Sequence, residues 1–378
     1  MYQIPLFDLN YDEREEIAVL ETLRSRWISM GEQCLRLEEE FAAALDVPHG
    51  LSVANCTVGL HMALRALNIG PGDEVLVPAL TFVATANAIL YVGATPVFCD
   101  IRSQDDLTID PEQIASRITS HTKAIVVMHY GGFPCDMDAV MRLADKHHLK
   151  VIEDACHGPL SDHSGGKKLG SIGDIGCFSF FSNKNISTGE GGLIVTSDSV
   201  LAQRLKLLRS HGMTTMSYER AKGHSTKYDV AELGYNYRLD DIRASLARVQ
   251  LQKLPQDLAQ RARVRGWYLE LLHGLDGIVV PFANHQTYSS NYIFPIVLLD
   301  ADADKRERVR DILHSRGVQT SVHYPAVHRF SIYQEHASRL PVTEYVADCE
   351  ITLPMFAKLT REQVEYIVDS LRFALVQR

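Results

Sequence analysis

The chain has 378 residues, 46% of them hydrophobic and 22% charged, which is typical of a soluble globular protein with room for more than one domain. Its net charge of -9, with lysine and arginine scattered along the chain, argues against nucleic acid or an anionic membrane as a partner. The seven cysteines form no C-x-x-C pair, and residues 1–8 lack a signal-peptide pattern. We therefore expect reduced thiols, no metal site and a cytoplasmic location.

Helical periodicity predicts a first helix over 11–26 and a second over 35–45. From residue 51, short apolar runs alternate with helical segments, an order typical of a mostly parallel sheet with helices on both faces. The uncharged stretch 75–98 is long enough to span a membrane, but its prolines and glycine favour strand, loop, helix and strand. The predicted strands are 51–54, 74–77, 96–100, 124–128 and 151–154, and the helices between them are 57–67, 81–92, 111–118 and 137–147.

Two further apolar runs, one ending at Phe181 and one over 193–196, predict strands, and a helix is expected over 200–210. Residues 213–226 lack periodicity and are a candidate for covering a substrate. A long helix over 240–272 precedes a second alternating region with strands expected at 291–299 and 319–323 and helices at 305–316 and 360–375. We predict a large α/β domain over 1–250, whose N-terminal segment packs on a small α/β domain over 251–378.

Lys184 lies in a polar, glycine-rich turn directly after one of the predicted buried strands. Burial there would depress the pKa of its amine, and a partly desolvated amine suits Schiff-base chemistry with a carbonyl cofactor. A solvated turn lysine is the simpler alternative. The turn alone does not decide between them.

Two other predicted strands end in polar side chains. Thr57 follows the strand 51–54 and opens a helix, so its hydroxyl and the free amides of the first turn would face an anion, unless Thr57 only caps the helix. Asp154 ends the strand 151–154, where a carboxylate could pair with a cationic ring nitrogen or cap the next segment. His157 follows and is either part of the same site or an ordinary buried histidine.

The carboxyl ends of parallel strands meet at one edge of a sheet, so Thr57, Asp154 and Lys184 can converge there. Pyridoxal 5′-phosphate (PLP) needs these three groups: a helix N-terminus for its phosphate, a carboxylate for its ring nitrogen and an amine for its aldehyde. The sequence therefore predicts a PLP site.

Several motifs in order resemble the DegT/DnrJ/EryC1/StrS family of PLP-dependent sugar aminotransferases, from about Trp27 to the C-terminus. The motifs are Asn55-Cys-Thr57-Val-Gly-Leu-His61, Gly70-Pro-Gly-Asp-Glu-Val-Leu-Val-Pro78, Thr81-Phe-Val-Ala-Thr85, Glu153-Asp-Ala-Cys-His157, Gly173-Asp-Ile-Gly-Cys-Phe-Ser-Phe180, Lys184-Asn185 with Gly189-Glu-Gly-Gly192, and Gly234-Tyr-Asn-Tyr-Arg-Leu239. The resemblance implies the aspartate aminotransferase fold (PLP fold type I). Residues 160–168 and the pair Ser182-Asn183 depart from the common family pattern.

The resemblance also implies roles for individual residues. Lys184 would hold the cofactor covalently and act as the base, Asp154 would pair with the ring nitrogen, and His157 would neighbour the ring. The remaining cofactor contacts implied are a stacking ring from Phe82, phosphate contacts from Thr57, the Val58 amide and Ser179, and a contact from Asn236 or Arg238 of a neighbouring subunit in a homodimer. His323, Tyr324 and His328 resemble a family segment near the substrate, although a structural histidine is an equal alternative.

The implied reaction moves an amino group from an amino acid, L-glutamate being the expected donor, to a keto-sugar nucleotide. The form Gly-Tyr-Asn-Tyr-Arg at 234–238 looks more like members that aminate C4, which favours a 4-keto-6-deoxyhexose. A 3-keto sugar nucleotide and a keto-inositol are alternative acceptors. Two other readings are a family dehydratase, which would carry histidine in place of Lys184, and a non-catalytic PLP-binding regulator, which no basic patch supports.

Overall fold

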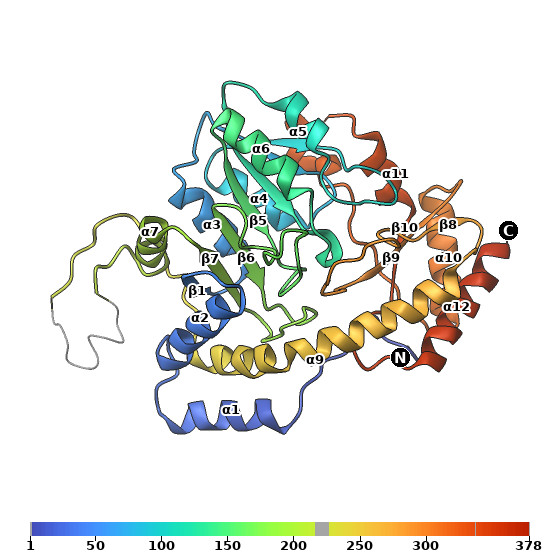
Figure 1. Cartoon of the computed structure of the whole chain (residues 1–378), viewed down its shortest axis with the longest axis horizontal. Helices are drawn as coiled ribbons and strands as arrows, with labels where there is room; N and C mark the ends of the chain where they lie inside the picture. Colours follow the sequence, from blue (N-terminus) through green and yellow to red (C-terminus); the bar gives the residue numbers. More distant parts are fainter. Residues whose placement is uncertain (1, 216–226, 337, 378) are drawn as a thin grey trace.

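The computed structural model describes residues 2–215, 227–336 and 338–377, and in this part of the chain a seven-stranded and a three-stranded sheet are covered by helices (Figure 1). The larger sheet has the order β1-β7-β6-β5-β4-β2-β3, and only β7 runs against its neighbours. The mostly parallel sheet predicted from sequence is therefore confirmed. Its strands are β1 (His49–Val53), β2 (Glu74–Pro78), β3 (Thr95–Cys99), β4 (Thr122–Met128), β5 (Lys150–Asp154), β6 (Ile175–Ser179) and β7 (Gly192–Thr196).

Alternate residues of the strands pack on opposite faces of this sheet, as a period of two requires. Val126 of β4 belongs to the core beneath α3, α4 and α7, whereas Val127 belongs to the core beneath α5 and α6. A third core joins β6 and β7 to α2 and α9. These helices are α2 (Glu32–Ala44), α3 (Cys56–Ala66), α4 (Val83–Tyr91), α5 (Pro111–Arg117), α6 (Met137–His147), α7 (Ser199–Arg209) and α9 (Asp241–Leu272).

The smaller sheet is antiparallel with the order β10-β9-β8 and has its own apolar core. The strand predicted at 319–323 is wrong, because this segment contributes only one bridge, between Ser321 and Thr352. Residues 317–319 instead exchange backbone hydrogen bonds with residues 3–4 near the N-terminus. The elements after α9 are β8 (Ile278–Val279), β9 (Phe294–Leu298), β10 (Glu350–Leu353), α10 (Ala303–Ser315), α11 (Pro341–Cys349), α12 (Arg361–Val376) and the 3₁₀ turns η2 (Val327–Arg329) and η3 (Ser331–His336). A further 3₁₀ turn, η1 (Tyr130–Gly132), follows β4.

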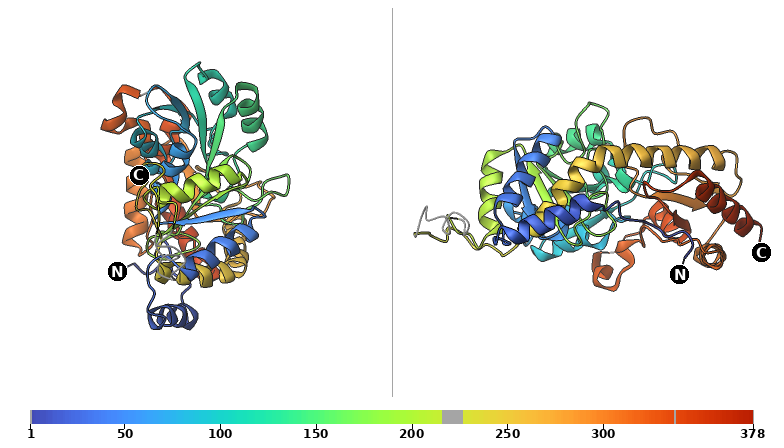
Figure 2. Two further views of the ribbon diagram at one scale, coloured as in Figure 1. Left: turned by 90° about the vertical axis from the view of Figure 1, so that its left-hand side faces the viewer. Right: turned by 90° about the horizontal axis from the view of Figure 1, so that it is seen from below.

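Helix α9 runs along one side of the molecule from the larger sheet to the smaller one (Figure 1). Helix α1 (Glu13–Arg24) lies against the outer side of α9, and the views in Figure 2 agree on this placement. The chain before α1 crosses to the smaller sheet, where Ile4 pairs with Val318. A division into domains at residue 250 stays a prediction.

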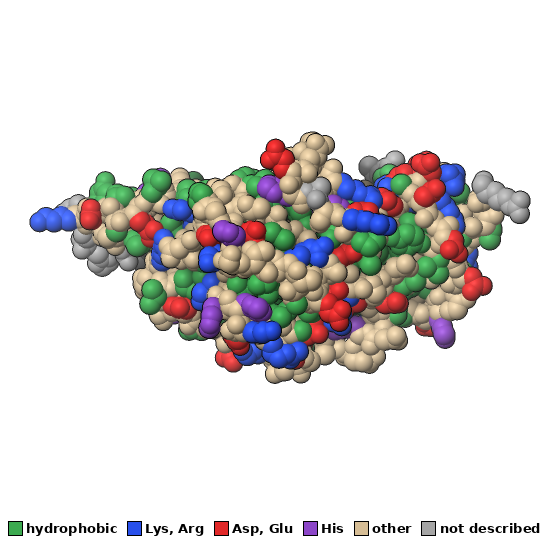
Figure 3. Space-filling model, turned by 90° about the horizontal axis from the view of Figure 1, so that it is seen from above, with side chains coloured by type: hydrophobic (Ala, Val, Ile, Leu, Met, Phe, Trp, Pro, Cys, Tyr) green, Lys and Arg blue, Asp and Glu red, His purple; other side chains and the backbone are tan. Residues whose placement is uncertain are grey.

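The uncharged stretch 75–98 forms β2, α4 and β3, as predicted. No helix in the described part of the chain combines the length and the apolar character needed to cross a membrane. On the face shown in Figure 3, acidic and basic side chains are intermixed. Of the segment predicted to cover a substrate, residues 216–226 lie outside the described residues.

Candidate active site

A cavity of about 410 Å³ opens at the carboxyl edge of the larger sheet. Asp154 ends β5, Ser179 ends β6, and Thr57 lies in the first turn of α3 after β1. Lys184 follows β6 by five residues in a loop without regular secondary structure. All four residues line the cavity, so the predicted convergence is confirmed.

The Lys184 amine is surrounded by sulfur and aromatic groups. Its Nζ lies 3.9 Å from the Cys156 Sγ and 4.2 Å from the centroid of the Tyr292 ring. Burial lowers the pKa of this amine, but Cys156, Tyr292 and the carboxylate of Asp154 outweigh burial and leave the pKa raised. The expected depression of the pKa is therefore wrong for the cofactor-free chain, in which Lys184 is an ammonium at neutral pH.

Asp154 is almost fully buried and is held by two donors. The Thr85 hydroxyl donates to its Oδ2 at 2.8 Å, and the Cys156 N–H donates to its Oδ1 at 3.2 Å. Since the Thr85 hydroxyl has one hydrogen, the 2.8 Å bond between Thr81 and Thr85 must be donated by Thr81. This chain of hydroxyls fixes one oxygen of the carboxylate at the sheet edge, and the bond from the Cys156 N–H is the local capping contact that the alternative predicted.

The N-terminus of α3 points its first turn at the cavity. Asn55, rather than Thr57, caps the helix, and its Oδ1 accepts from the Val58 N–H at 3.0 Å. The Val58 amide, predicted to face a phosphate, is therefore already engaged. The N–H groups of Cys56 and Thr57 are in the first turn and have no intrahelical acceptor, which leaves the helix end suited to an anion.

His157 is fully buried behind two tyrosines and does not line the cavity. Burial, together with the charge of Lys184, holds the pKa of His157 well below its usual range, so the ring is neutral. The Gly131 N–H donates to Nδ1 at 3.2 Å, which assigns the proton to Nε2, and Nε2 donates to the Tyr324 hydroxyl at 2.9 Å. Tyr324 can then turn its own hydrogen toward the cavity.

The other predicted site residues divide into two groups. Phe82, His323 and Tyr324 line the cavity. Burial and the charge of Lys184 lower the pKa of His323 to about 3, so this ring is neutral too. His328 lies outside the lining and contacts Glu344 at 3.2 Å. Asn236 and Arg238 also lie outside it, and Asn236 is exposed beside Ser210.

Sequence reasoning missed several residues that line the cavity. The Tyr292 ring lies against His157 at a tilt of 30°, with ring centroids 4.2 Å apart, and Tyr292 precedes β9, more than 100 residues after Lys184. No local pattern marks Tyr292. Thr85, which holds Asp154, is part of a quoted motif and lies in the first turn of α4, whereas its partner Thr81 precedes that helix. The other polar and aromatic residues of the lining that were missed are Asn55, Cys56, Cys156, Phe181, Asn183 and Glu190.

The fold and this cavity define a PLP-dependent transferase of fold type I. The model of the DegT/DnrJ/EryC1/StrS aminotransferase family matches residues 10–372, and the chain belongs to this family. It is thus a sugar aminotransferase that uses PLP.

Three similar proteins support this assignment. The UDP-N-acetyl-3-dehydro-alpha-D-glucosamine 3-aminotransferase of Acidithiobacillus ferrooxidans is 41% identical over 92% of this chain and 89% of its own length. Helicobacter pylori PseC, an aminotransferase involved in the biosynthesis of pseudaminic acid, is 31% identical with a TM-score of 0.91 and covers 99% of this chain and 98% of its own. DesV of S. venezuelae is 33% identical with the same TM-score and covers 100% of both chains.

The residues present fit PLP. The cavity brings together an amine, a buried carboxylate and the N-terminal turn of a helix, which is the donor and acceptor set that the aldehyde, ring nitrogen and phosphate require. Ser179 lies beside that turn among the lining residues.

Proposed function

We propose that this protein transfers an amino group from an amino acid, L-glutamate being the expected donor, to a keto-sugar nucleotide. The convergence of Lys184, Asp154 and the first turn of α3 on one cavity carries the proposal. It gives each reactive part of PLP a partner of matching chemistry.

Bound PLP supplies an aldehyde that joins amines and a ring that accepts electrons. Lys184 would hold the cofactor through Nζ, and its free amine would take the proton from the Cα of the donor. Asp154 would pair with the ring nitrogen and keep it protonated. Thr57 and Ser179 would bind the phosphate, Phe82 would cover the ring, and His157 would act on the site through Tyr324.

Two acceptor classes are supported by different observations. The form of residues 234–238 favours a 4-keto-6-deoxyhexose linked to a nucleotide. The relative that is 41% identical is named for a 3-keto substrate, which favours a 3-keto sugar nucleotide as the second candidate. His323 and Tyr324, which lie between α10 and η2, line the cavity, so we place them against the sugar.

We infer that the active site is completed by a second copy of the chain. Among the described residues, Lys184 is the one cation that lines the cavity, yet both the cofactor phosphate and the donor carboxylate are anions. Phe82 and Phe181 are about half exposed beside the cavity, which suits an interface. Asn236, exposed on its own chain, and Arg238 are the residues that we expect the partner to supply.

A half-reaction screen tests the proposal. The pyridoxamine phosphate form of the protein is mixed with 4-keto and 3-keto sugar nucleotides and with keto-inositols, and return of the near-visible absorption identifies the acceptor. Return with one class of keto-sugar nucleotide supports the proposal and decides the position aminated. No return with any nucleotide-linked sugar contradicts it.

A further inference from the structure

The loop that carries Lys184 is tied to the N-terminal segment of the chain. Ser187 lies three residues beyond Lys184, and the Tyr11 hydroxyl donates to its carbonyl oxygen at 2.7 Å. Burial raises the pKa of Tyr11, so the phenol keeps its proton at neutral pH and remains a donor. The Ser187 hydroxyl in turn donates to the Ser182 carbonyl at 3.1 Å, which closes the loop around Lys184.

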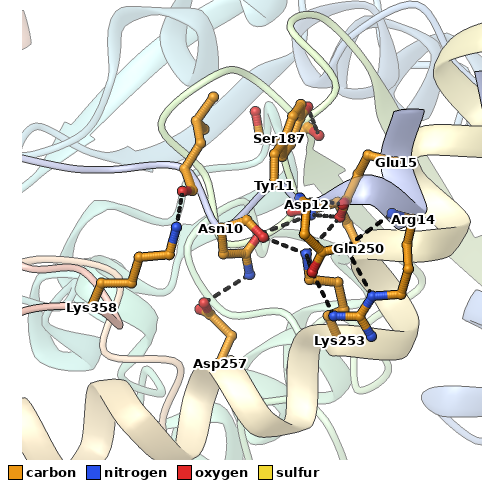
Figure 4. A network of polar contacts seen from close by, with 11 residues as sticks. Asn10, Tyr11, Asp12, Arg14, Glu15, Ser187, Gln250, Lys253, Asp257 and Lys358 are labelled. Carbon is orange, nitrogen blue, oxygen red and sulfur yellow. Dashed lines mark hydrogen bonds and ion pairs between the residues drawn. The ribbon is translucent and has the colours of Figure 1, made fainter. Parts of the chain in front are cut away.

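Lys253 of α9 holds this N-terminal segment in place (Figure 4). Its ammonium donates to the Asn10 carbonyl, to the Asp12 carboxylate at 3.0 Å and to the Glu15 carboxylate at 2.8 Å. Lys253 and Glu15 are both buried, which is costly for charged groups unless they are paired and hydrogen-bonded. The segment on either side of Tyr11 is thereby anchored to a rigid helix.

The same face of α9 is also connected to Lys184 through Tyr292. Asn10 donates to Asp257 at 2.9 Å, and Asp257 pairs with Arg261 at 2.9 Å. Arg261 donates to the carbonyl of Tyr292 at 3.4 Å, and the Tyr292 ring contacts the Lys184 amine. Residues 253, 257 and 261 are four apart and share one helical face. That face is therefore connected to Lys184 by two routes, one through Tyr11 and Ser187 and the other through Tyr292.

We infer that residues 10–15, anchored by Lys253, position the Lys184 loop, and that Tyr11 is the positioning residue that transmits this anchoring. The inference rests on the proposed role of Lys184 as the base. A base must lie within hydrogen-bonding reach of the proton that it takes, and small displacements of a reacting group are costly in rate. The loop lacks regular secondary structure, so its position depends on contacts such as the one from Tyr11.

The variant Tyr11→Phe tests this inference because it removes only the hydroxyl. In the cofactor-free protein, the Lys184 and Thr188 amides, which bond to Phe181 and Phe180, should exchange hydrogen about fivefold faster, as the loss of one hydrogen bond predicts. In the loaded enzyme, kcat should fall by about the same factor with KM for the acceptor unchanged. Tyr366→Phe is the matched control, since it also deletes a hydroxyl that donates to a carbonyl, that of Arg316.

Faster exchange of the loop with a lower kcat, both absent in Tyr366→Phe, supports the inference. Unchanged exchange of the loop amides overturns it, and so does faster exchange with an unchanged kcat. Lys184→Ala separates this inference from the proposed function. If that variant kept the near-visible absorption, the role of Lys184 would fail, while the exchange result would still show whether Tyr11 holds the loop.

Discussion

Removal of the Thr85 hydroxyl should lower the stability of the protein, because Asp154 loses a hydrogen-bond donor. Thr85 and Asp154 are both almost fully buried, and their 2.8 Å bond has a charged acceptor. Such bonds contribute about 1.5–3 kcal/mol to stability, and the Thr85 hydroxyl also accepts the neutral bond from Thr81, which contributes about 0.5–1.5 kcal/mol. Thr85→Val, which keeps the shape of the side chain, should therefore lower the free energy of unfolding by the sum of the two. The carboxylate keeps one donor, the Cys156 N–H, and should bind the cofactor less tightly.

Thr81→Val is the matched control for Thr85→Val. Thr81 is equally buried and donates to Thr85, but does not contact Asp154. Its loss removes a bond between two neutral hydroxyls, which contributes about 0.5–1.5 kcal/mol. Urea unfolding of both cofactor-free variants measures the difference, and the rate of cofactor release from the loaded forms measures its consequence. Equal losses of stability in the two variants would refute a special contribution from the Asp154 contact.

Three further predictions concern the cofactor. Lys184→Ala should abolish the near-visible absorption of the loaded protein, and an unchanged spectrum would remove Lys184 from the site. Asp154→Asn should leave a folded protein with severely reduced turnover, because the ring loses its electron-accepting character; circular dichroism and steady-state rates check both parts. Since the pKa of Lys184 is raised, its reactive neutral fraction should grow about tenfold per pH unit below that pKa. Stopped-flow mixing with PLP should show attachment that accelerates from neutral to alkaline pH, and a flat profile would contradict the raised pKa.

The environment of Lys184 explains why the sequence-based expectation for its pKa had the wrong sign. Burial was predictable from the apolar strand that precedes it, and burial alone lowers the pKa of an amine. The opposing groups, Cys156 and Tyr292, come from other segments. Their distances from the amine depend on how β5 and the chain before β9 are placed beside the loop, which no local pattern records.

The sequence by itself determined the elements of the larger sheet, because apolar runs with periods of 2 and 3.6 residues are local consequences of burial on a strand or a helix. It also determined the cavity residues that follow strands, since parallel strands end at one edge. Thr57, Asp154 and Lys184 were therefore predictable, and with them the cofactor, whereas the family came from the resemblance of several motifs in order.

Only the tertiary structure decided which side chains surround these three residues. His157 lies behind Tyr324 rather than in the cavity, and Tyr11 reaches Ser187 across 176 positions of the chain. Such contacts depend on the packing of elements that are distant in sequence, and each involves a single side chain without a periodic signal. The physical reason is that periodicity reports which face of an element is buried, whereas a hydrogen bond depends on the positions of two particular atoms.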